Sequence, residues 1–106
     1  MDISADYPLL TKGLQQQLID FIFQLRRRKQ TSFAIATDTL ALLKRILGSC
    51  RWQHTQQCID YIRGVGHLLM DARPMELAIG NMVRRVLFII REEFLTKLNE
   101  EPEPGA

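Results

Sequence analysis

Residues 75–99, which read MELAIGNMVRRVLFIIREEFLTKLN, decide the fold class. Large apolar side chains recur in this stretch at steps of three and four positions, which is the spacing of one face of an α-helix. Strict alternation, the pattern of a half-buried strand, does not persist anywhere along the chain. The main apolar stripe consists of Ile79, Met82, Val83, Val86, Ile90 and Phe94.

Three more helices are predicted upstream, at residues 11–29, 32–48 and 55–73. Gly48 is expected to close the second helix in a left-handed conformation, Thr55 to cap the third, and Pro74 to prevent its continuation. The stripes expected to face the core are Leu14, Leu18, Phe21 and Leu25, then Ala36, Leu40, Leu43 and Leu47, then Cys58, Ile62, Val65 and Leu69.

These patterns together predict an all-α fold, a small bundle of about four helices within residues 11–99. Residues 1–10 are expected to form an N-terminal extension. Residues 100–106 contain two prolines and a glycine among acidic residues, so we expect a flexible acidic tail there.

The composition is typical of one soluble domain and limits its partners. Of the 106 residues, 46% are hydrophobic and 25% are charged. The 14 basic and 12 acidic residues leave a formal net charge of +2, too small for long-range attraction of nucleic acid or membrane lipid. Two cysteines without further disulfide candidates favour a reducing compartment, and the start lacks the pattern of a signal peptide. The longest apolar run, residues 86–90, is too short to cross a bilayer, so we expect a cytosolic chain.

Three helices carry more apolar surface than one stripe accounts for. A solvated helix normally leaves its second side polar, so the excess indicates either a thick core or a surface for a partner protein. The extra residues upstream are Ile19 and Phe23 in the first helix, and Ile35, Leu42 and Ile46 in the second.

The last helix carries the clearest candidate interface. Phe88 and Leu95 lie seven positions apart, with Arg84 and Arg91 interleaved on the same edge. Interfaces favour an aromatic or aliphatic anchor flanked by arginine, so this edge is predicted to bind a partner protein. Arg85 and Glu92, seven positions apart on another face, are expected to form a charged rim.

Motifs for chemistry are weak. Cys50, His54 and Cys58 follow at steps of four, but a loop is expected between them, and only His67 could serve as a fourth zinc ligand. The glycines at 64 and 66 have neither a preceding strand nor a third glycine, so we interpret them as close helix packing. We therefore expect no catalytic residues, no cofactor and no metal.

A basic run ends the first helix, and an aromatic residue precedes the third. The run at 26–29 suits the negative end of a helix dipole, with an acidic partner or an RNA backbone as the functional alternative. No aromatic residue is interleaved with it, which lowers the case for nucleic acid. Trp52 is interpreted as a packing anchor between helices.

A longer string of residues supports a family resemblance. Residues 80–87, GNMVRRVL, followed by IIREE at 89–93, resemble the beta-subunit family of eukaryotic translation initiation factor 2B. The order of upstream signals agrees with it over residues 14–94, and the string favours beta over the alpha and delta paralogues. These signals include Thr39, Leu40, Leu42, Leu43, Arg51, Trp52, Ile62, Arg63, Gly66, Ala72, Pro74 and Glu76.

The resemblance implies an N-terminal helical domain that belongs with a larger Rossmann-like domain in the family. On this view the chain is a fragment or short isoform without that second domain. The resemblance also implies a regulatory, non-catalytic role, because catalysis of guanine-nucleotide exchange lies in another subunit. The implied partners are the other subunits of translation initiation factor 2B and, through the complex, translation initiation factor 2. The basic run and the acidic tail fall outside the family pattern.

Overall fold

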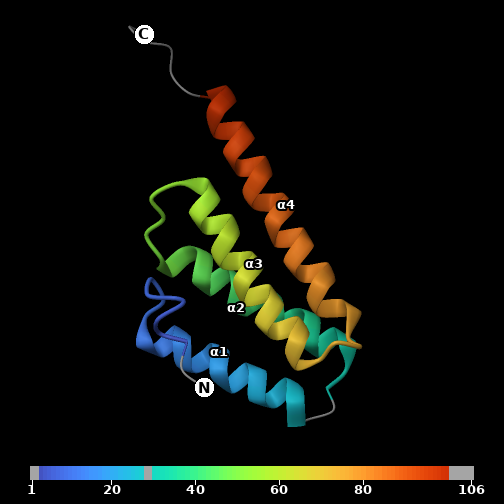
Figure 1. Cartoon of the computed structure of the whole chain (residues 1–106). Helices are drawn as coiled ribbons and strands as arrows, with labels where there is room; N and C mark the ends of the chain where they lie inside the picture. Colours follow the sequence, from blue (N-terminus) through green and yellow to red (C-terminus); the bar gives the residue numbers. More distant parts are fainter. Residues whose placement is uncertain (1–2, 28–29, 101–106) are drawn as a thin grey trace, which may run out of the picture.

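The described part of the chain contains four α-helices, as the sequence predicts. The computed structural model describes residues 3–27 and 30–100, and for residues 94 and 96–100 it describes the backbone alone. The helices are α1 (Lys12–Arg27), α2 (Ser32–Ser49), α3 (Thr55–Ala72) and α4 (Leu77–Glu100). Helix α4 runs back alongside α3 and continues beyond it, with α1 crossing at the other end (Figure 1).

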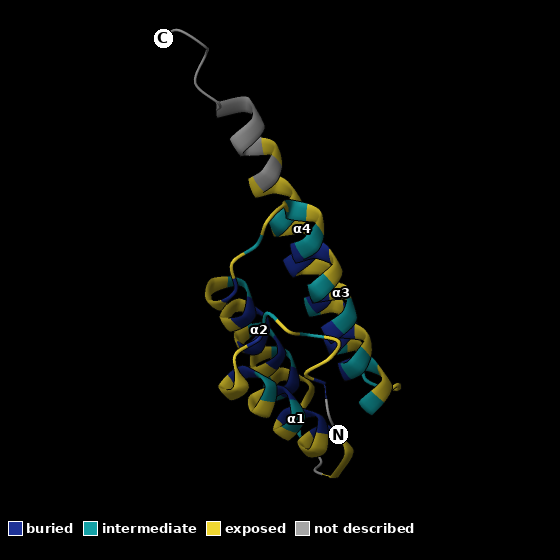
Figure 2. Cartoon of the chain, turned by 60° about the vertical axis from the view of Figure 1, so that its left-hand side comes forward, coloured by how far each residue is buried: buried dark blue, intermediate teal, exposed yellow. Residues whose placement is uncertain are grey.

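The core lies between the facing sides of the helices (Figure 2). Helix α4 packs against both α2 and α3, and α1 packs against α3 and α2. The stripes predicted for α1 and α3 are buried in full. The expected stripe of α4 is buried or half-buried at every position except Phe94, whose side chain lies outside the described part. Leu87 adds to the buried side of α4.

The prediction for α2 was right only in part. Leu43 of the expected stripe is fully buried, but Ala36, Leu40 and Leu47 are only half-buried. Ile35, Leu42 and Ile46, for which a partner surface was the other interpretation, are almost completely buried. The reason is tertiary, because α2 is covered by α4 on one side and by α1 on another. The apolar excess of α2 therefore completes the core, and the thick-core alternative holds for this helix.

Helix boundaries also differ from the predictions, and α4 begins at Leu77 rather than near Met75. Gly48 lies inside α2 without a left-handed conformation, and Cys50 caps the end of that helix in an extended conformation. Helix α3 is capped by His54 rather than by Thr55, since the His54 Nδ1 atom accepts a hydrogen bond of 3.1 Å from the Gln57 amide. The Gln57 side chain in turn accepts from the Gln53 amide at 2.9 Å.

The interpretation of Gly66 as a packing glycine is confirmed. It is buried on α3, and a Cβ atom at this position would lie 2.9 Å from both γ-carbons of Val83 on α4. Apolar carbons normally stay about 3.5–4.0 Å apart. The two helices can approach this closely only because residue 66 has no side chain.

Trp52 is a packing anchor, as expected. Its ring lies 5.2 Å from Tyr61 and its Nε1 atom donates to the Leu47 carbonyl at 3.2 Å. Tyr61 meets Tyr7 at 5.5 Å, which ties the segment before α1 to α3. Ile3 and Leu10 from that segment are buried among the helices. The three rings therefore join the segment before α1 and the loop between α2 and α3 to the bundle.

Candidate partner-binding surface

The side of α4 turned away from the bundle carries the predicted interface residues. Ile79, Val83 and Val86 face the core, and the opposite side of the helix is open. Phe88 is 62% exposed and Leu95 is 53% exposed, while Arg84 and Arg91 are exposed beside them. A thick core therefore does not explain the apolar excess of α4.

Leu77 belongs to the same line and was missed from the sequence. It is 77% exposed and precedes Arg84 by seven positions, two helical turns. The step of seven was the available signal, but Leu77 lies at the first residue of the helix, where no stripe had yet formed. We call Leu77, Arg84, Phe88, Arg91 and Leu95 the outer face of α4; it extends over about 27 Å.

Charged residues border this outer face. Arg84 donates to the Asn81 side-chain oxygen at 2.6 Å, which holds its guanidinium group along the helix. Arg85 and Glu92, for which a charged rim is a prediction, are both exposed on the flank beside Phe88. Ile89 is 46% exposed on the far side of that flank. Apolar anchors bordered by charges are the pattern of many protein interfaces.

Other exposed apolar side chains are separate from α4 or lie at its start. Phe23 on α1 is 38% exposed, and the Arg27 guanidinium carbon lies 5.5 Å from its ring centre. Ile19 is half-buried against the core. Phe33 and Met75 are both strongly exposed, beside the hydrogen bond that joins Ser32 to Glu76 at 3.1 Å.

A hollow of about 530 Å³ opens where α2 ends and α3 begins. Its apolar walls come from Leu47, Trp52, Ile89 and Ile90, with Glu93 among the polar lining residues. The hollow faces the second half of α4. Through Ile89 and Ile90, the hollow continues the apolar surface of α4 towards the loop between α2 and α3.

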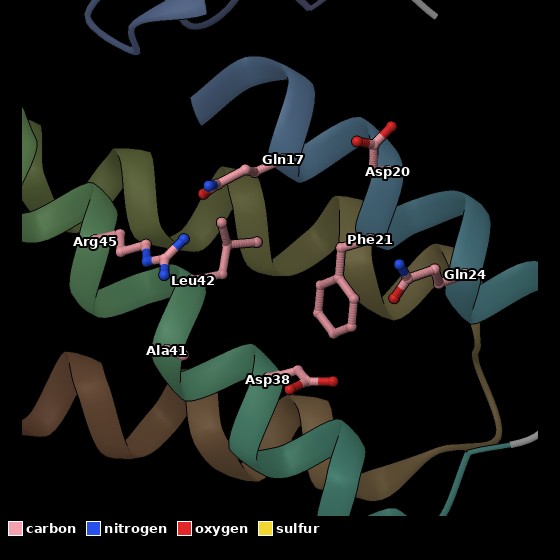
Figure 3. A pocket seen from close by; sticks show the side chains of 8 residues that line it. All are labelled: Gln17, Asp20, Phe21, Gln24, Asp38, Ala41, Leu42 and Arg45. Atoms are coloured by element: carbon pink, nitrogen blue, oxygen red, sulfur yellow. The ribbon is translucent and has the colours of Figure 1, made fainter. Parts of the chain in front are cut away.

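A second depression, of about 410 Å³, lies between α1 and α2. Figure 3 shows Asp20 of α1 and Asp38 of α2 on opposite sides of it, with the Phe21 ring between them. Asp20 accepts a hydrogen bond from the Gln16 side chain at 2.8 Å. The lining residues are carboxylates, amides, an arginine and apolar groups, which do not form a nucleophile–base pair.

The four residues considered as zinc ligands, two cysteines and two histidines, lie in different local environments. Cys50 and Cys58 are buried free thiols. Burial raises the pKa of Cys58 to about 11, with the negative charge of Cys50 as a smaller cause, and burial also raises the pKa of Cys50. His54 caps α3, and His67 is exposed. Within the described ranges, no three histidine, cysteine or acidic residues are grouped to hold a metal ion.

The basic run is described only in part. Arg26 and Arg27 are exposed in the last turn of α1, and Arg28 and Lys29 lie outside the described residues.

In the part of the chain covered by the structure, none of the helices has the length and apolar character needed to cross a membrane.

Comparison with known proteins gives the family. A sequence model described as the initiation factor 2 subunit family matches residues 28–103, which include α2, α3 and α4. The chain belongs to the initiation factor 2 subunit family. The match covers the whole of the helix that carries the outer face.

Two relatives of this initiation factor family bear the name translation initiation factor eIF2B subunit beta. The protein of Schizosaccharomyces pombe is 40% identical over 85 residues, covering 77% of this chain and 22% of that protein. The protein of Dictyostelium discoideum is 43% identical over 77 residues, covering 72% of this chain and 20% of that protein. The predicted resemblance to the beta subunit is thus confirmed. The chain spans about a fifth of the length of these curated relatives.

Proposed function

We propose that this chain is a non-catalytic interaction module of translation initiation, working in the cytosol. Its outer face of α4 binds other subunits of translation initiation factor 2B. Through those contacts, and through contacts with initiation factor 2 in the assembled complex, it supports guanine-nucleotide exchange on that factor. The proposal combines the similarity to beta subunits with the exposure of Leu77, Phe88 and Leu95 on one helix.

The exposure of the outer face carries the proposal. A large apolar side chain on a solvated helix exposes surface to water that a partner would cover, and each such side chain contributes about 1.5–3 kcal/mol when fully buried. Arg84 and Arg91 are placed to meet carboxylates at the edge of that contact. The depression between α1 and α2 offers no comparable apolar anchor.

A binding measurement tests the proposal. The chain is immobilised and exposed in turn to purified subunits of translation initiation factor 2B and to initiation factor 2. We expect binding to at least one of them, and we expect Phe88→Asp to weaken it by tenfold or more, because interface aromatic residues often contribute over 1.4 kcal/mol.

Phe23→Asp is the matched control. Phe23 is a partly exposed phenylalanine on α1, which packs mainly against α3 and α2, so this variant adds the same charge outside the helix that carries the proposed contact. A folded wild-type chain that binds none of these proteins contradicts the proposal. Equal weakening by both variants also contradicts it, because the effect would then not belong to α4.

A further inference from the structure

Arg85 and Glu92 lie beside the outer face, on the charged rim that borders it. Both are exposed on α4. Neither has an oppositely charged residue three or four positions away, where helical ion pairs form. Seven positions separate them, so they lie about 10 Å apart along the helix and only about 20° apart around it. On α4 itself they are therefore two opposite charges on one line, without a partner at the spacing of a helical ion pair.

Apolar side chains lie between these two charges. Phe88 and Ile89 lie midway along this line. Phe88 is offset from it by about 50° in one direction around the helix, and Ile89 by about 50° in the other. They are 62% and 46% exposed. The strip thus reads, along the helix, as a positive charge, an apolar centre and a negative charge.

This order is complementary to itself when reversed. A second copy of α4 that lies antiparallel, with the two-fold axis between positions 88 and 89, places Glu92 of the copy opposite Arg85 at both ends. The same axis brings Phe88 to the Phe88 of the copy, and Ile89 to its Ile89. An isologous two-fold contact requires such self-complementarity.

The geometry points to a homodimer in which two copies of this chain pair antiparallel along α4, with Arg85 of each copy bound to Glu92 of the other. The inference goes beyond the proposed function, because its partner is the chain itself and its ion pair lies on the flank.

The contact is small, so the dimer is weak. The strip from Arg85 to Glu92 spans only about two helical turns. Two turns offer less surface than the roughly 800 Å² that each partner buries in a stable interface. Arg84 and Arg91 of both copies come to lie along one edge of the dimer and repel each other weakly through water. We expect a dissociation constant on the order of 10–100 μM.

Charge reversal tests the pairing. The full chain is measured by light scattering and sedimentation at roughly 5 and 500 μM, bracketing that constant. Arg85→Glu alone, or Glu92→Arg alone, places two like-charge pairs in the dimer and should weaken it by roughly tenfold or more. The double variant Arg85→Glu with Glu92→Arg restores both pairs with the signs exchanged, and should restore the dimer.

Controls separate folding from association. Arg63→Glu reverses an exposed charge on α3 and should leave the dimer unchanged. Circular dichroism confirms that each variant is folded. A wild-type chain that stays monomeric at the higher concentration overturns the inference, as does a double variant no better than the single ones. The proposed function is judged separately, by binding to the initiation factor subunits.

Discussion

The close approach of α3 and α4 at Gly66 makes Gly66→Ala strongly unfavourable for so small a change. In the interior of a helix, alanine is normally more stable than glycine by about 0.8–1.0 kcal/mol. At position 66 the new methyl group would meet both Val83 γ-carbons at 2.9 Å, and Val83 is itself buried. Overpacking of a core costs about 1–3 kcal/mol, so we expect a net loss of about 1 kcal/mol.

Gly48→Ala is the matched control. Gly48 also lies within a helix, but a Cβ atom there would meet nothing within 4 Å. This variant should gain about 0.5 kcal/mol. Urea unfolding should therefore separate the two alanine variants by roughly 1.5 kcal/mol, which corresponds to about 6–12 °C in Tm for a domain of this size.

A double variant identifies the cause of the loss. Val83→Ala alone leaves a cavity in the core and should destabilise the chain. Combined with Gly66→Ala, it removes the two carbons that clash with the new methyl group, so the pair should be more stable than the sum of the single changes. Additive effects, or a Gly66→Ala variant as stable as Gly48→Ala, would refute the close approach of the helices.

Three further predictions concern other sites. Thr39→Val should stabilise the chain by about 1 kcal/mol in urea unfolding, because the fully buried Thr39 hydroxyl has no hydrogen-bond partner in the described part; a loss would show that it is satisfied. The pKa of Cys58 is higher in the folded chain, so between pH 9 and about 11 the unfolded state loses the proton first and stability falls, by up to about 1.4 kcal/mol per pH unit. Unfolding at pH 8 and pH 10 should show a steeper fall for wild type than for Cys58→Ala. Phe88→Asp should change the free energy of unfolding by less than about 0.5 kcal/mol, and a larger loss would assign Phe88 to the core.

Sequence periodicity predicted the helices and most of the core, since the stripes of α1 and α3 are visible from spacing alone. It was right only in part at α2, where nearly every side of the helix carries an apolar residue and only Leu43 of the expected stripe is fully buried. Which side is buried there depends on where α1 and α4 lie, and spacing within α2 does not contain that information.

The outer face of α4 was predictable in part. Phe88 and Leu95 stand out because they lie opposite a strong stripe. Leu77 does not, because it is the first residue of the helix and its exposure depends on the exact start. The N-cap of α3 is His54, one residue before the predicted Thr55. The sequence predicts that a threonine hydroxyl accepts the capping hydrogen bond, but the His54 ring nitrogen accepts it instead.

Side-chain footprinting of the chain, alone and mixed with the other subunits of translation initiation factor 2B, examines the outer face of α4 itself. Hydroxyl radicals should label Leu77, Phe88 and Leu95 in the free chain, since all three are exposed. In the mixture we expect these three to be protected, while Phe23 on α1 stays labelled as in the free chain. Equal labelling of Phe88 and Leu95 with and without the other subunits, in a sample where binding is detected, would show that the partner covers a different surface.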